Sequence, residues 1–218
     1  MLEDRTGLDE LRRLGARSVP VLSRGDDYVF AQNIGRVVEF LGLNEATGPV
    51  LSPDQLIQRL QGFLDAAIRM IPQMPDTKLS TEVPNRPRSY RVLGHHIFRI
   101  AETFLEVADG ATLAYEKLTS VPPDSMQTTA DIVDYGAGVK RHLTGWWAAK
   151  PDKSGREPVQ TYYGQQMLHE YLERTTWHVG QHVRQWVMLL DMAGINADRP
   201  PGGADFADLP MPSKVWDG

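Results

Sequence analysis

Residues 168–192 read LHEYLERTTWHVGQHVRQWVMLLDM. Apolar side chains recur along this stretch on one face at about 100° per residue, which is the period of an amphipathic helix. The stretch contains no proline, and Gly194 follows it as a C-terminal stop signal. The pattern therefore predicts a helix from Leu168 to Met192, which we interpret as the last helix of a helical bundle.

Two histidines, His178 and His182, lie four residues apart in this helix. Residues at this spacing lie on the same side of a helix, one turn apart. On a helical wheel His182 lies roughly 50° and His178 roughly 90° from the centre of the apolar face, on one flank, while His169 falls on the other. Two such imidazoles can bind one metal ion if a third ligand comes from elsewhere. The same spacing also suits two half-buried residues that only hydrogen-bond to neighbours.

The third ligand is predicted on a helix from about Ser89 to Ala108, which carries the adjacent histidines His95 and His96. On its wheel His96 lies roughly 70° from the centre of the apolar face, and His95 points nearly opposite, toward solvent or another contact. We therefore predict His96 as a metal ligand and His95 as a surface residue.

Two more helices complete the predicted bundle, which spans residues 50–195. The first starts with Ser52 as N-cap and Pro53 at the first helical position, and runs to about residue 71. The other starts near Asp124 or Ser125 and ends near Ala149.

The segments between and after these helices are rich in proline and polar residues. Residues 72–87 and 150–163 are predicted to be surface loops. Residues 196–218 are predicted to be an extended C-terminal tail that lies over a surface.

Residues 1–45 predict a small separate α-β-β-α piece. Its elements are a helix over Leu8–Leu14, strands over Ser18–Arg24 and Asp27–Ala31, and a helix over Asn33–Leu43. A two-stranded hairpin is marginal alone. We therefore expect the piece to dock on the main domain or on a second subunit, and we expect a homodimer.

Composition and charge exclude several classes of function. The net charge of −5 does not favour nucleic acid or an anionic membrane as partner. No apolar run approaches the ~18 residues of a transmembrane helix, and the first residues lack the pattern of a signal peptide, so we expect a cytoplasmic protein. Cysteine is absent, so any metal must bind His, Asp or Glu.

Four long helices, a histidine on the second and His-x-x-x-His on the fourth resemble the DinB/YfiT-like superfamily of metalloenzymes. The resemblance covers about residues 52–194 and is carried by Leu93-Gly94-His95-His96-Ile97 and Trp177-His178-Val179-Gly180-Gln181-His182-Val183-Arg184-Gln185. It implies that His96, His178 and His182 bind one divalent transition metal, zinc or nickel in most members.

Residues 1–45 resemble the C-terminal half of a glutaredoxin or thioredoxin-like domain. In that family a Val-Pro dipeptide, here Val19-Pro20, opens the third strand, and a Gly-Asp hairpin, here Gly25-Asp26, follows. The preceding β-α-β unit of the family, which carries its redox cysteines, has no counterpart here. The resemblance therefore implies a truncated module without redox activity.

These patterns predict a metal-dependent enzyme that acts on a small organic substrate. The metal would activate a water or a low-molecular-weight thiol, in a transferase, isomerase or hydrolase reaction. The thiol is implied by the resemblance, because some members of the superfamily use mycothiol, bacillithiol or glutathione.

Several other side chains are candidates for supporting roles. Arg184 and Gln185 are candidates to orient ligands or to cross-link helices, and Arg184 equally suits a surface or helix-helix ion pair. Asp131 and Asp134 are candidates for a general base or for a carboxylate that hydrogen-bonds to a ligand, although acidic residues are also favoured in the first turn of a helix. Two alternatives to the enzyme remain: a non-catalytic metal-binding or dimerisation module of stress-related type, and an interaction domain that binds no metal.

Overall fold

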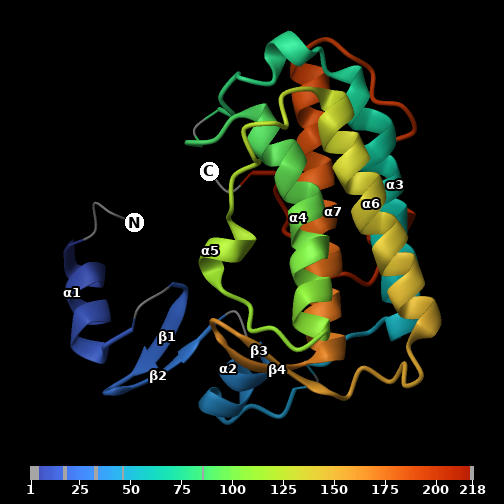
Figure 1. Cartoon of the computed structure of the whole chain (residues 1–218). Coiled ribbons are helices and arrows are strands. Elements are labelled where there is room, and N and C mark those ends of the chain that lie inside the picture. The colour runs from blue at the N-terminus through green and yellow to red at the C-terminus, as the bar shows by residue number, and fades with distance from the viewer. Residues whose placement is uncertain (1–4, 17–18, 32–33, 46, 85, 217–218) are drawn as a thin grey trace. The chain divides into compact units, whose positions relative to one another are not determined.

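A computed structural model of the protein describes residues 5–16, 19–31, 34–45, 47–84 and 86–216 (Figure 1). The chain divides into two compact units, residues 1–48 and residues 49–218. The described residues are mainly helical, which confirms the predicted class. No helix among them is both long enough and apolar enough to cross a membrane.

The first unit holds two helices and a hairpin: α1 (Arg5–Leu14), β1 (Val21–Arg24), β2 (Asp27–Phe30) and α2 (Ile34–Leu41). The strands pair antiparallel around Gly25, whose φ of +65° suits glycine in this turn. The peptide bond before Pro20 is cis. Ser18 and Asn33, where we predicted the first strand and the second helix to begin, lie outside the described residues.

Four long helices that run side by side dominate the second unit (Figure 1). They are α3 (Pro53–Met70), α4 (Tyr90–Ala108), α6 (Thr129–Ala149) and α7 (Leu168–Met192). Helix α7 packs against α3 and α4, and α6 packs against the same two helices. The apolar faces meet in a shared core, in which Trp186 is the largest fully buried side chain.

Local hydrogen bonds fix where these helices begin. At the start of α3 the Ser52 hydroxyl accepts from the Gln55 backbone, and the Gln55 side chain accepts from the Ser52 N–H at 2.9 Å. At the start of α7 the Glu170 carboxylate accepts from the Met167 N–H at 3.0 Å. Both starts agree with the sequence prediction, because each is encoded within one turn.

Helix α6 begins at Thr129, later than the predicted start at residues 124–125. Thr128 and Asp131 form a reciprocal capping box. Asp76, distant in sequence, accepts from the Thr129 N–H at 2.8 Å and from its hydroxyl at 2.9 Å. The start is thus set partly by a tertiary contact that a local pattern does not contain.

Two glycines let neighbouring helices approach closely. A Cβ at Gly136 would lie 2.4–2.6 Å from three ring atoms of Phe98, and a Cβ at Gly180 would lie 2.9 Å from Cε2 of Phe63. Both distances are too short for a carbon–carbon contact. The packing of α6 on α4, and of α7 on α3, therefore requires glycine at these positions.

Short elements that we did not predict lie between and after the long helices. Strands β3 (Pro158–Thr161) and β4 (Gly164–Met167) form a hairpin within and after the predicted loop 150–163. The remaining short elements are η1 (Ile71–Gln73), η2 (Asp76–Lys78), α5 (Tyr115–Leu118) and α8 (Gly203–Phe206). Three or four residues are too few to show a period, so the pattern could not reveal them.

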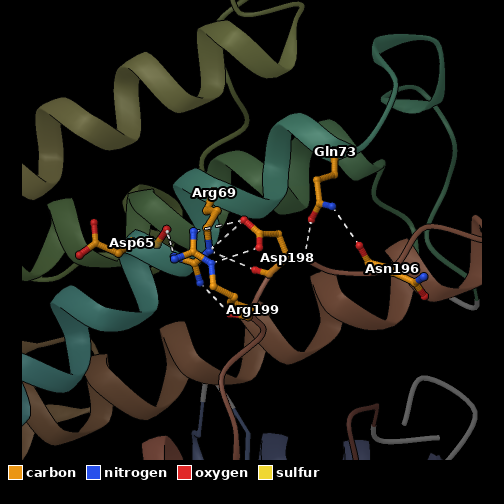
Figure 2. Close-up of polar contacts among 6 residues, drawn as sticks. All are labelled: Asp65, Arg69, Gln73, Asn196, Asp198 and Arg199. Carbon is orange, nitrogen blue, oxygen red and sulfur yellow. Dashed lines mark hydrogen bonds and ion pairs between the residues drawn. The ribbon is translucent and has the colours of Figure 1, made fainter.

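Hydrogen bonds attach the segment after α7 to α3 and η1 (Figure 2). The Arg69 guanidinium donates to the backbone carbonyls of Asp198 at 3.0 Å and Arg199 at 2.7 Å. The Gln73 side chain donates to the Asn196 carbonyl at 2.9 Å and accepts from the Asp198 N–H at 2.8 Å. These bonds hold the first residues of the tail in place.

Candidate metal centre

Helices α4 and α7 bring the three predicted ligands together. His96 lies on α4, and His178 and His182 lie on α7, one turn apart. Their candidate ligand nitrogens all lie within 4.8 Å of one another. The Nε2 atoms of His178 and His182 are 3.1 Å apart. Two ligands at tetrahedral positions, ~2.0–2.1 Å from a zinc ion, would be about 3.3 Å apart. The donor set, and the spacing of the His178–His182 pair, therefore fit a metal ion.

The surroundings favour the neutral form of these imidazoles. His96 is 8% and His182 6% exposed, while His178 is partly exposed. Burial, followed by the Arg88 charge, lowers the pKa of His96 to about 4. Burial and neighbouring imidazoles lower the pKa values of His178 and His182 well below the usual range. Neutral imidazole is the form that binds metals, so no proton has to be displaced from these rings near pH 7.

Gln185 is hydrogen-bonded to one of the predicted ligands. Its side-chain oxygen accepts from Nδ1 of His182 at 2.6 Å. This bond leaves the Nε2 lone pair of His182 free to face the other two rings. Gln185 was predicted as a candidate to orient ligands, and its position fits that role.

The C-terminal tail reaches the same face of α7. The side-chain nitrogen of Gln185 donates to the Val215 carbonyl at 3.1 Å, and that of Gln181 donates to the same carbonyl at 2.6 Å. Arg184 donates to the Pro212 carbonyl at 2.9 Å and to the Gln181 side chain at 3.0 Å. Arg184 thus holds the tail, and the tail is coupled to His182 through Gln185.

His95 is buried, which corrects its predicted surface position. It is 4% exposed, and its ring stacks on Tyr135 with centroids 5.2 Å apart. The wheel prediction failed because α4 is covered on most sides, by α6 and α7 and by α5. Nδ1 of His95 is buried without a hydrogen-bond partner among the described residues.

Other candidate residues have structural roles. His169 does not join the group; its Nε2 lies 2.8 Å from the Leu51 carbonyl. Asp131 caps α6 through Thr128. Asp134 lines a hollow of about 270 Å³ on the outer side of α4 and α6, together with the exposed His142. Neither aspartate belongs to the three-histidine group.

Arg88 was not singled out from the sequence, yet it acts on all three histidines. Its positive charge is among the causes that lower each of their pKa values. One of its nitrogens, Nη2, lies 3.4 Å from the side-chain oxygen of Gln185. Arg88 directly precedes the N-cap of α4 and has no periodic pattern around it, so the sequence offered no signal for this role.

The fold and the site together define a class: a helical protein in which a buried three-histidine group on two packed helices can hold a metal ion. A solved structure with this fold is the crystal structure of a DinB-like protein from Bacillus cereus ATCC 10987. It aligns with a TM-score of 0.54 and 18% identity over 67% of this chain and 94% of that chain. The likeness shows a DinB-like fold. No protein-family model and no curated protein sequence matches the chain.

Proposed function

We propose that the protein is a metal-dependent enzyme of the DinB-like superfamily and that α3, α4, α6 and α7 form the superfamily's four-helix bundle. The observation that carries this proposal is the group of three imidazoles, kept neutral by burial and within 4.8 Å of one another. Three neutral protein ligands are typical of catalytic sites, because structural zinc sites usually have four.

In this proposal His96, His178 and His182 hold a divalent transition metal, zinc or nickel. A bound metal of this kind polarises a substrate oxygen and lowers the pKa of a coordinated water or thiol. Gln185 fixes the tautomer of His182, and the partly exposed His178 marks the side from which a substrate enters. The substrate is a small organic molecule, in a transferase, isomerase or hydrolase reaction, with a low-molecular-weight thiol as cosubstrate.

The proposal extends to the rest of the chain. The α-β-β-α order of the first unit supports a truncated glutaredoxin or thioredoxin-like module. We assign that module to the subunit interface of a homodimer in the cytoplasm. Deletion of residues 1–45 should then lower the oligomeric mass; an unchanged mass would count against the interface role.

Metal content tests the central claim. Protein purified without an affinity tag or chelator should contain about one equivalent of a transition metal per chain, by elemental analysis. A His178→Ala/His182→Ala double variant should contain none, whereas His142→Ala, which removes an exposed histidine of α6, should retain it. Absence of metal from the wild-type protein, even after reconstitution, would refute the enzyme proposal.

A second candidate is a non-catalytic metal-binding or dimerisation module of stress-related type. It is favoured by one observation: within the described residues, no carboxylate that could act as a general base joins the three histidines. The two candidates differ in coordination. X-ray absorption of the loaded protein should show three nitrogen ligands and an exchangeable fourth ligand for the enzyme, and four protein ligands for the module.

A further inference from the structure

Two arginines flank the three-histidine group along α7. Arg174 lies one turn before His178 on the same helix. Arg88 contacts Gln185, about one turn after His182. The stretch from residue 174 to 185 covers about 16 Å of helix, at ~1.5 Å per residue. One guanidinium therefore lies toward each end of the group.

Aromatic rings hold both guanidiniums in place. Arg174 lies over the rings of Tyr163, at 4.9 Å from the centroid, and Trp177, at 5.6 Å. Arg88 lies 6.0 Å from the ring centroid of Trp216 in the tail. Stacking on a ring orients the flat group and leaves N–H donors at its edge free for planar acceptors.

Neither arginine is neutralised by an acid. Among the described residues no carboxylate lies within ion-pair distance of Arg88 or Arg174, whereas Arg99, on α4, is paired with Glu102 and Glu106. Nε of Arg88 is buried and has no hydrogen-bond partner in the described part of the chain. A partly buried guanidinium without a negatively charged partner costs free energy, unless a bound anion supplies that partner.

The charges that act on the three imidazoles are also all positive. Arg88 acts on His96, His178 and His182, and Arg174 acts on His178. Neutral imidazoles do not offset the two charges of a divalent cation, so a loaded centre between two arginines would carry a large uncompensated positive charge. Such a site attracts anions and rejects their neutral analogues.

We propose that the substrate of this site is a small organic anion, with Arg88 and Arg174 as its anion-binding side chains. The inference rests on the proposed metal centre and narrows its substrate class. The shared chemistry is a planar or tetrahedral oxyanion, either a carboxylate or a phosphate group, which guanidinium binds through paired N–H donors. The reacting part of the molecule then lies beside the histidines, between the two arginines.

Binding of simple probes tests the proposal without any assay of activity. Succinate, inorganic phosphate and the neutral succinamide would be titrated by calorimetry into the metal-loaded protein at low salt. Succinate or phosphate should bind at least tenfold more tightly than succinamide, and the better of the two identifies the headgroup. Equal binding of succinate, phosphate and succinamide would overturn the proposal even if every variant failed to fold.

Charge-matched variants then locate the site. At least one of Arg88→Gln and Arg174→Gln should weaken binding of the preferred anion about 10–100-fold, with one metal still bound per chain, because so small a probe contacts the guanidinium at one end of the stretch. Arg141→Gln, which removes the same charge from an exposed position on α6, should bind as the wild type does. Variants of Arg88 and Arg174 that fold and bind the anion as tightly as Arg141→Gln would refute the assignment.

The same titrations on metal-free protein separate this inference from the proposed function. If no metal binds, the metal-dependent function fails. The anion site then stands if the metal-free protein still prefers the anion and loses that preference in Arg88→Gln or Arg174→Gln. It falls if the metal-free protein shows no preference.

Discussion

Gln185 joins His182 to the C-terminal tail, and its replacement by leucine tests what that contact does. Leucine has nearly the volume of glutamine but cannot accept the 2.6 Å hydrogen bond from Nδ1 of His182. The imidazole can then place its proton on either nitrogen. In the simplest case half of the molecules would then carry the proton on Nε2 of His182, where it blocks metal binding. In many of the others the ring would be turned so that Nε2 does not face the metal.

The expected loss follows from the burial of this contact. Gln185 and His182 are each 6% exposed, so bulk water cannot easily replace the lost acceptor. Partners of metal-bound histidines typically contribute 10–100-fold in metal affinity. For a short, buried bond we expect the upper part of that range, about 30–100-fold, or ~2–2.7 kcal/mol of binding free energy.

Gln181→Leu is the matched control. Gln181 is 7% exposed and donates to the Lys214 and Val215 carbonyls, and no hydrogen bond joins its side chain to any of the three histidines among the described residues. Competition for Zn²⁺ against a chromophoric chelator would give both affinities. A loss in Gln185→Leu and little change in Gln181→Leu would support the orienting role. Equal losses would show that Gln185 acts only by holding the tail, and no loss in either would refute the reasoning.

Two further predictions concern the metal-free protein. Gly136→Ala should destabilise the protein by about 1–3 kcal/mol more than Gly145→Ala does, because only the methyl group at position 136 meets Phe98. Both variants replace a helical glycine by alanine, so the gain in helix propensity is the same in each. Equal denaturation midpoints would contradict the close approach of α4 and α6. Stability should fall between pH 6.5 and about 4, because burial lowers the pKa of His96 to about 4 and the unfolded chain takes up a proton first. The slope is at most about 1.4 kcal/mol per pH unit for this residue; urea denaturation should show a shallower slope in His96→Gln, and identical slopes would disprove the assignment.

The sequence predicted those features that depend on a repeating pattern within a single helix. The bounds of α7 and the placement of His178 and His182 on one flank follow from period and from nearby stop signals, which are local properties. His96 could be chosen over His95 because one residue changes direction by about 100°. The metal bound by these residues stays a prediction.

What the sequence could not predict depends on contacts between distant segments. His95 lies on the polar side of its wheel, yet α5 and α6 cover that side. Arg88 matters because of Gln185 and Trp216, which are far away in the chain. The tail was predicted to lie over a surface. Apart from the bond from Trp216 Nε1 to the Met188 sulfur, its hydrogen bonds to α7 in the described part of the chain are made by backbone carbonyls, which every residue type carries. Such contacts leave no compositional trace.

The two fastenings of the tail have a joint consequence. Residues 196–199 are held by α3, and residues 212–215 are held by α7. When the second contact opens, the chain behind it remains attached at residues 196–199 and at Phe206, which stacks on Phe63 of α3 with ring centroids 5.1 Å apart, so its effective concentration at α7 stays near the millimolar range. The tail therefore behaves as an intramolecular ligand of α7, which can dissociate and rebind while it stays attached to the rest of the protein. A cut between residues 207 and 211 would abolish this advantage, although it leaves every hydrogen bond of the second contact intact. The cleaved piece would then have to bind through that contact alone.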